Sequence, residues 1–370
     1  MRAPLLLASA TACVAIGPWV PGPVSHTYEV LDLGVLPGGE EAWAFGLNDA
    51  GQVALSAQYD LQRRFYHAVF WDEGEMTDLG HLGMGAFHSF ATAVNAQGHV
   101  VGGSPQDLGF SRRDRAFLHD GTELSDLGAL TGDGSSFAFD INDHGDIVGL
   151  SATGDFFSFK EILHAVVWSN GQIMDLGTLG GLYSRAHGLN KSLHVVGSSL
   201  TADGPTHAFV WNGSMVDLGT LGGAFSEAWD IDDAGRVVGL AQNSDGARRA
   251  FMAQNGFMRD LGVLPGAQAS AAYGINNAAE VVGTSWVVGE GPHAVLWRGS
   301  LILDLNDWIE SDTGWTLQVA RRINASGKIV GYGRREGRTR AFLLTPPACR
   351  REGLRHGLFC NLLQLVVPSR

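Results

Sequence analysis

The chain has 370 residues, of which 45% are hydrophobic and 17% are charged, and it contains 51 glycines. This composition excludes a disordered protein, which needs low hydrophobicity and high charge, and it is typical of many short strands joined by tight turns. The formal net charge of −13 argues against a general nucleic-acid-binding protein, so we expect no nucleic-acid partner.

The N-terminal segment resembles an export signal. A single charge, Arg2, precedes Leu5, Leu6 and Leu7 and a run of small residues that reaches Gly17. We therefore expect residues 1–25 to direct export and the protein to be extracellular or periplasmic. No later segment reaches the ~18 consecutive apolar residues of a membrane-spanning helix, so we expect no transmembrane helix.

The main feature of the sequence is a repeat that occupies residues 26–345. The tripeptide Asp-Leu-Gly, degraded to Asp-Leu-Asn in its last copy, recurs at intervals of 42 to 49 residues. Its copies begin at Asp32, Asp78, Asp126, Asp175, Asp217, Asp260 and Asp304. A period of about 45 residues is that of one four-stranded blade of a β-propeller.

Each period carries the same four strands in the same order. An alternating strand such as 226–231 ends in a turn such as 142–145, where Asn or Asp tolerates the turn geometry and Gly supplies a positive φ. A β-branched strand such as 237–239 follows, then a third strand such as 207–211, and a tight turn leads into the Asp-Leu-Gly strand. Helical periodicity is absent, which excludes an α-solenoid.

The two ends of the repeat predict how the array closes. The chain enters at 28–33 with a fourth strand and leaves at 340–344 with a third strand. We therefore expect an all-β, seven-bladed propeller of four-stranded antiparallel blades, in which the N-terminal strand completes the last blade and removes the exposed sheet edges. An open β-solenoid is the alternative. Residues 346–370 have no repeat signature and are expected to form a C-terminal tail, either disordered or closed by a disulfide.

These motifs also resemble a named family. The His-Ala-Phe third strand, the Asp-Leu-Gly-Thr-Leu-Gly-Gly segments at 175–181 and 217–223, and the Ile-Asn-x-x-Gly-x-Val-Val-Gly pattern resemble the bacterial HAF extracellular repeat family over about residues 28–344. The resemblance implies an exported protein of unestablished biochemical role. Members often end in a sorting tail with a Pro-Glu-Pro signal, which the segment 360–370 lacks, so the resemblance does not extend to that anchoring route.

Topology predicts the face on which a partner binds. The loops after strands two and four emerge on one face and vary in length, whereas the turns on the other face are short and uniform, so binding residues are expected on the loop-rich face. The first residue of each third strand reaches that face: His67, Arg115, His164, His207, Arg249, His293 and Arg340. This rim could meet an anionic polymer. The alternative is that each side chain makes the same structural bond in its blade, near the Asp of Asp-Leu-Gly.

A second candidate on that face is not repeated. The loops between strands two and three of blades seven, one and two contain Arg63, Arg64, Arg112, Arg113, Arg334, Arg335 and Arg338. Guanidinium forks match carboxylate and sulfate geometry. This basic sector is either an ordinary solvated surface or a site for an acidic polysaccharide or extracellular protein. We therefore take a non-catalytic binding or scaffold propeller as the leading hypothesis.

Catalytic, cofactor and metal motifs are absent from the sequence, so no cofactor or metal is expected. A site built by several blades in the central mouth would escape motif analysis, which keeps a carbohydrate-active lyase or hydrolase as the rival hypothesis. Its candidates are Asp140, Asp230 and Arg322, which share one register in the innermost strand. A purely structural envelope protein is the third hypothesis.

Overall fold

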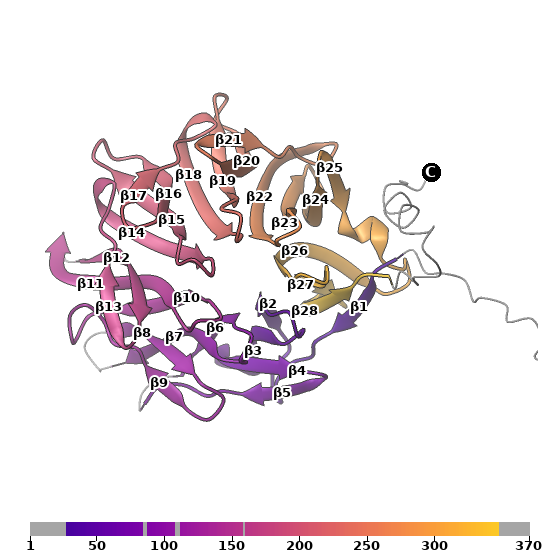
Figure 1. Cartoon of the computed structure of the whole chain (residues 1–370). Coiled ribbons are helices and arrows are strands. Elements are labelled where there is room, and N and C mark those ends of the chain that lie inside the picture. Colours follow the sequence, from indigo (N-terminus) through magenta and orange to yellow (C-terminus); the bar gives the residue numbers. More distant parts are fainter. Residues whose placement is uncertain (1–26, 84–86, 108–111, 158–159, 348–370) are drawn as a thin grey trace, which may run out of the picture. The chain divides into compact units, whose positions relative to one another are not determined.

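The computed structural model describes residues 27–83, 87–107, 112–157 and 160–347. Its strands form seven four-stranded antiparallel sheets, arranged as blades around one axis (Figure 1). The prediction of a seven-bladed β-propeller is confirmed. No helix in the described ranges is long and apolar enough to cross a membrane. The predicted export signal and all but the first two residues of the predicted tail lie outside the described residues.

The first three blades follow the chain from the innermost to the outermost strand. Blade one comprises β2 (Ala42–Leu47), β3 (Val53–Asp60), β4 (Phe65–Asp72) and β5 (Glu75–Asp78). Blade two comprises β6 (Phe90–Val94), β7 (Val100–Asp107), β8 (Arg112–His119) and β9 (Leu124–Asp126). Blade three comprises β10 (Ser136–Ile141), β11 (Ile147–Phe157), β12 (Lys160–Ser169) and β13 (Gln172–Asp175).

The next three blades repeat this order. Blade four comprises β14 (Gly180–Leu189), β15 (Val195–Thr201), β16 (Thr206–Trp211) and β17 (Met215–Asp217). Blade five comprises β18 (Gly222–Ile231), β19 (Val237–Asn243), β20 (Arg248–Gln254) and β21 (Phe257–Asp260). Blade six comprises β22 (Ala267–Ile275), β23 (Glu280–Val287), β24 (Gly291–Arg298) and β25 (Leu301–Asp304), and the 3₁₀-helix η1 (Leu305–Trp308) follows it.

The seventh blade is built from both ends of the repeat. It contains β26 (Trp315–Ile323), β27 (Ile329–Arg335) and β28 (Arg338–Thr345), and its outermost strand is β1 (Glu29–Asp32). β1 pairs antiparallel with β28, with Glu29 opposite Thr345 and Asp32 opposite Phe342. The predicted closure by the N-terminal strand is therefore confirmed, and it gives blade seven four strands like the other blades by pairing the outer edge of β28.

A β-bulge recurs at one position in the innermost strand of all seven blades. In blade three the register slips between Ala138 and Asp140, so that Phe139 is the extra residue. The corresponding slip follows a fully buried alanine in every blade: Ala44, Ala91, Ala138, Ala186, Ala228, Ala272 and Ala320. A bulge twists the strand and re-aims the side chain of its extra residue.

The bulge explains the glycine that ends the Val-Val-Gly motif. A Cβ atom on Gly149 would lie 1.9 Å from the carbonyl oxygen of Phe137, and one on Gly197 would lie 1.9 Å from that of Arg185. At these two positions strands one and two approach too closely for a side chain on strand two, although blade one has Leu55 at the equivalent position, opposite Ala44.

The third-strand motif serves the interfaces between blades. In four blades its third residue is a phenylalanine with no exposed surface: Phe117, Phe209, Phe251 and Phe342. The backbone N–H of its alanine donates to a buried serine of the next blade, as from Ala208 to Ser226 Oγ at 2.8 Å. Four other interfaces have this bond, from Ala68 to Ser89, Ala116 to Ser136, Ala165 to Ser184 and Ala250 to Ser270.

A ring of asparagine side chains ties the short turns together. In six blades the Nδ2 of the turn asparagine donates to the backbone carbonyl of the equivalent residue in the next blade. The donors are Asn48, Asn95, Asn142, Asn190, Asn276 and Asn324. The bond from Asn324 to Asn48 O, at 3.1 Å, joins the last blade to the first.

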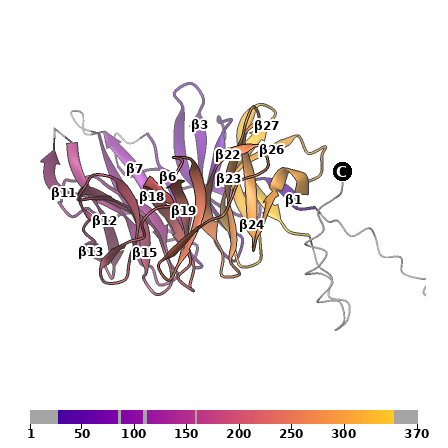
Figure 2. The same ribbon diagram turned by 90° about the horizontal axis from the view of Figure 1, so that it is seen from above.

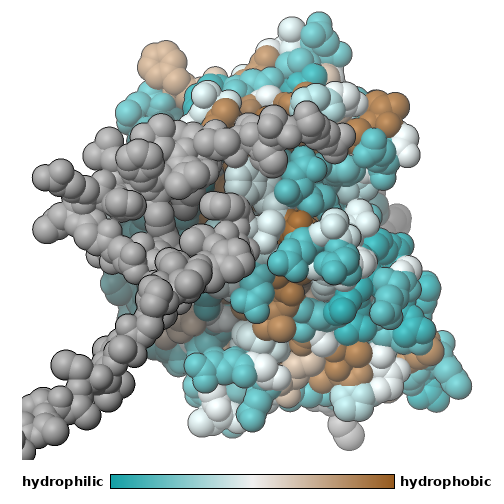
Figure 3. Space-filling model, turned by 90° about the vertical axis from the view of Figure 1, so that its right-hand side faces the viewer, coloured by the Kyte–Doolittle hydropathy of each residue, from teal (hydrophilic) through white to brown (hydrophobic). Residues whose placement is uncertain are grey.

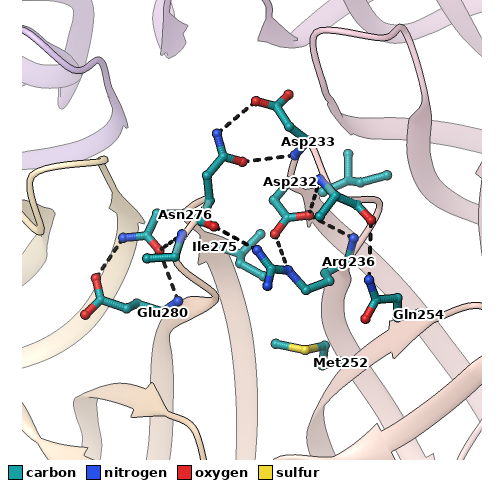
Figure 4. Close-up of polar contacts among 12 residues, drawn as sticks. Asp232, Asp233, Arg236, Met252, Gln254, Ile275, Asn276 and Glu280 are labelled. Carbon is teal, nitrogen blue, oxygen red and sulfur yellow. Dashed lines mark hydrogen bonds and ion pairs between the residues drawn. The ribbon is translucent and has the colours of Figure 1, made fainter.

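Blade five departs from this ring. Its turn residue is Asp232, which has no N–H to donate. Arg236 takes the missing place, because its Nε donates to Asp232 and its Nη2 donates to the carbonyl of Asn277 in blade six at 2.9 Å (Figure 4). Asn277 also contacts Asp233, which adds a second bridge between the two turns.

Candidate functional site

The rim residues of the third strands all lie beside the aspartate of Asp-Leu-Gly in their own blade. His67 Nδ1 lies 2.8 Å from Asp78, and that aspartate also accepts from the backbone N–H of Gly80. The other pairs are Arg115–Asp126 at 2.9 Å, His164–Asp175 at 2.9 Å, His207–Asp217 at 2.8 Å, Arg249–Asp260 at 3.7 Å, His293–Asp304 at 2.6 Å and Arg340–Asp32 at 3.1 Å. The geometry is that of the structural alternative, since the same pair joins strand three to strand four in each blade, at hydrogen-bond distance in six of them and at 3.7 Å in blade five.

The arginines of the predicted basic sector are partly engaged within the protein. Arg335 Nη1 lies 3.0 Å from Asp32, and Arg338 Nη2 lies 2.8 Å from Glu40. Arg334 donates to a carbonyl of its own hairpin, that of Gly337. In blade seven, two of the three arginines of the sector are therefore paired with carboxylates, so fewer positive charges are available to a partner than the residue types alone indicate.

The remaining arginines lie in blades one and two. Arg63 is 3.6 Å from Asp60, yet 72% of its side chain is exposed, and Arg64 beside it is exposed as well. Arg113 is half-buried in β8. Arg112 begins the same strand, and its side chain lies outside the described residues. The hairpin that carries Arg63 and Arg64 rises on the upper side of the propeller beside β3 (Figure 2).

Aromatic side chains gather next to this hairpin. We call Tyr59, Phe65, Tyr66, Phe87 and His88 the blade-one aromatic surface. Phe65 and Phe87 stack at 5.2 Å with their planes 14° apart, and His88 meets Phe65 edge-on at 4.9 Å. Phe87 keeps 52% of its surface exposed. The surface therefore offers a flat, accessible ring face on the loop-rich side.

The aromatic surface continues inward along blades one and two. The ring of Tyr66 lies 5.3 Å from that of Trp43, and the ring of His88 lies 5.9 Å from that of Phe90. Trp43 and Phe90 belong to the innermost strands β2 and β6. A row of rings thus leads from the rim toward the axis. Figure 3 shows another side of the molecule, the one that carries β1 and β25. There the visible hydrophobic residues are scattered among polar ones and form no comparable row.

The bulged residues form a second cluster around the axis. We call them the axial ring: Phe45, Thr92, Phe139, His187, Trp229, Tyr273 and Arg321. His187 stacks on Trp229 at 4.5 Å and contacts Phe139 at 5.2 Å, and Trp229 meets Tyr273 edge-on at 5.6 Å. Neighbouring blades therefore place their bulged side chains in contact.

The three candidates for catalysis directly follow the bulge. The charge of Arg322 acts on both Asp140 and Asp230, although Arg322 forms an ion pair with neither of them in the described part of the chain. Burial raises the pKa of Asp140 to about 7, against the opposing effect of Arg322, and burial also raises the pKa of Asp230.

Both carboxylates, however, hold backbone groups. Asp230 accepts from the N–H of Ile231 at 2.9 Å and from that of Ile275 in the next blade at 3.0 Å. Asp140 makes the equivalent pair with Ile141 and Leu189. Such bonds fix the strands of adjacent blades, so these aspartates have a structural role whatever else they do.

The chain has no match among protein-family models or among curated proteins. Solved structures share its fold. A puromycin-hydrolysing peptidase of Mycobacterium tuberculosis is similar at a TM-score of 0.52 and 12% identity over 85% of this chain, which spans only 52% of that one. YCF48 bound to D1 peptide is similar at a TM-score of 0.50 and 10% identity, over 90% of this chain and 100% of that one. At these identities the similarity shows a shared β-propeller fold and does not indicate which activity this protein has.

One member of the axial ring, His187, belongs to a buried histidine–carboxylate pair. His187 Nε2 lies 2.9 Å from Glu227, whose carboxylate also accepts from Ser198 at 3.2 Å. His187 is 5% exposed, and its Nδ1 has no hydrogen-bond partner in the described part of the chain. Among the described residues, no three His, Cys, Asp or Glu side chains gather in a way that could hold a metal ion.

The axial ring and the blade-one aromatic surface were not predicted from the sequence. A signal for the ring was available, because the residue after the repeated alanine is aromatic or histidine in five of the seven blades. No comparable signal exists for the surface, since Phe65 and Phe87 have no equivalents in the other repeats.

Proposed function

We propose that this propeller is an exported binding module that holds an acidic polysaccharide on its loop-rich face, at the blade-one aromatic surface. The observation that carries the proposal is the stack of Phe65 on the half-exposed Phe87, next to the exposed guanidinium of Arg63. Aromatic faces provide a large apolar contact area for sugar rings, and arginine forks bind carboxylate or sulfate groups in two parallel hydrogen bonds.

Two further facts support this surface over the rest of the basic sector. Arg335 and Arg338 lie 3.0 Å and 2.8 Å from the carboxylates of Asp32 and Glu40, whereas Arg63 lies 3.6 Å from Asp60 and keeps 72% of its side chain exposed. Arg63 and Arg64 lie in an exposed hairpin beside the stacked rings. The pair of stacked phenylalanines is also not repeated around the ring, as expected of a binding site on a repeated scaffold.

The test is retention of the protein by immobilised acidic and neutral polysaccharides, with polygalacturonate and dextran as the probes. We expect salt-sensitive retention on polygalacturonate only, because the attraction between exposed charges is screened by salt. The Phe87→Ala and Arg63→Ala variants should each weaken retention about tenfold, or ~1.4 kcal/mol. Phe257→Ala is the matched control, since Phe257 is 82% exposed and follows the turn between β20 and β21, on the opposite face.

Two results would overturn the proposal. One is retention on polygalacturonate that Phe87→Ala reduces no more than Phe257→Ala does. The other is equal retention on dextran and polygalacturonate.

A second candidate function is a carbohydrate-active enzyme with its site at the axis. The raised pKa of Asp140, about 7, favours it, because a general acid or base works best with a pKa near the working pH. Release of small fragments from any polysaccharide, abolished by Asp230→Asn, is the result that this function requires.

A further inference from the structure

Arg321 occupies an unusual position in the axial ring. It is the bulged residue of β26 in blade seven, and its guanidinium lies over rings from three other blades. The distances to the ring centroids are 4.5 Å for Tyr273, 5.5 Å for Phe45 and 5.6 Å for Trp229. These rings belong to blades six, one and five, so the side chain of Arg321 contacts both neighbouring blades and the blade beyond one of them.

The charge of Arg321 has no anionic partner in the described part of the chain. Its Nε is buried without a hydrogen-bond partner, and the groups that act on its charge are Tyr273, Arg322 and Tyr332. The adjacent Arg322 differs in both respects. It donates to the carbonyl of Tyr273 at 2.8 Å and has Asp140 and Asp230 as charge neighbours.

An enclosed and unpaired guanidinium is costly, because burial removes water from a charged group. Burial accordingly lowers the pKa of Arg321. Ring faces attract a cation, but they accept none of its hydrogen bonds in the way that an anion does. The Nε–H of Arg321 is therefore left without an acceptor, while three aromatic rings lie against its guanidinium.

Solvent reaches this part of the axis. Phe45, Trp229, Tyr273 and Arg321 are each partly exposed, although all seven innermost strands surround them. The buried residues that flank them in the same strands, such as Ala228 and Ala320, have no exposed surface. These four side chains thus keep part of their surface accessible, although they belong to the innermost strands.

We propose that the axial ring is a ligand site for a small organic acid with a flat ring, whose carboxylate is bound by Arg321. The carboxylate would accept a hydrogen bond from the unpaired Nε–H of Arg321, and the ring of the ligand would pack against Trp229 and Tyr273. The inference does not rest on the proposed function, because it depends on the axial side chains alone and not on the loop-rich face.

Calorimetric titration with benzoate tests the site, with benzamide as the neutral ligand of the same shape. We expect the unaltered protein to bind one benzoate per chain and to bind benzamide at least tenfold more weakly. Arg321→Gln should reduce benzoate affinity to that for benzamide. Arg259→Gln, a change in the outermost strand β21, should leave benzoate binding unchanged.

Circular dichroism and thermal melting show whether Arg321→Gln folds. If it does not, the comparison of benzoate with benzamide on the unaltered protein decides the question. The inference is overturned if benzoate does not bind, if benzamide binds equally well, or if a folded Arg321→Gln protein binds benzoate as before. Retention of Arg321→Gln on polygalacturonate is expected to persist, which separates this site from the loop-rich surface.

Discussion

The asparagine ring predicts how a substitution in blade four changes stability, and blade five indicates which second change should restore it. Asn190 is 4% exposed, its Nδ2 donates to the carbonyl of Asp232 at 3.0 Å, and its Oδ1 accepts from the N–H groups of Ser192 and His194. Asn190→Asp keeps the accepting oxygen and replaces the donor with a second oxygen. The carbonyl of Asp232 is then left buried without its partner and faces a carboxylate.

The size of the effect follows from those contacts. A buried acceptor that loses its partner costs about 1–3 kcal/mol, and the desolvated carboxylate adds to this, so we expect a loss of about 2–4 kcal/mol in the free energy of unfolding at pH 7. The loss should shrink at pH 4, because a protonated carboxyl group again has a hydrogen to donate.

Blade five shows how a propeller with aspartate at this position remains closed, through Arg236 four residues later (Figure 4). His194 is the equivalent residue in blade four. We therefore expect the added change His194→Arg to recover at least half of the stability lost in Asn190→Asp.

Urea unfolding followed by circular dichroism measures both effects, as shifts in the midpoint at constant slope. Asn212→Asp is the control, because Asn212 lies in an exposed turn of the same blade. The reasoning is refuted if Asn190→Asp destabilises the protein no more than Asn212→Asp, or if His194→Arg restores nothing.

Two further predictions concern buried polar groups. Ser226→Ala should lower the free energy of unfolding by about 1–3 kcal/mol, because the N–H of Ala208 loses its buried acceptor; a thermal melt equal to that of the unaltered protein would contradict this. The pKa of Asp140, about 7, lies above its unfolded value, so the folded state holds a proton that the unfolded state releases and stability falls as the pH rises from about 4 to 7. Between pH 5 and 7 the free energy of unfolding of the unaltered protein should therefore fall by about 2–3 kcal/mol more than that of the Asp140→Asn variant. Urea midpoints that change equally with pH in the two proteins would exclude the raised pKa of Asp140.

Features that recur in every repeat were predictable from the sequence. The seven blades, their strand order and the closing strand all follow from motifs that recur at one period. The contact between third-strand residues such as His207 and the aspartate of Asp-Leu-Gly was also among the predicted alternatives. In each case one local interaction occurs in all seven blades, and the sequence repeats it.

Features made by contacts between distant parts of the chain were not predictable in this way. Arg335 has Asp32 as its partner across 303 residues, a contact that exists only once the ring has closed. The bulge could not be read from residue types, because it depends on how strands one and two approach each other. Arg321 and Arg322 are identical residue types and adjacent in sequence. Because Arg321 is the bulged residue, its Nε has no acceptor, whereas Arg322 donates to the carbonyl of Tyr273.

The repeated bulge has a consequence for how proteins of this design diverge. An unvarying alanine precedes it in all seven blades, and these alanines are fully buried, whereas the bulged position itself holds six different residue types. The backbone therefore tolerates wide substitution at one level of the axis without change to the interfaces that stabilise the ring. Seven such positions can be altered one at a time, so the chemistry of the axis can evolve while the fold stays constant.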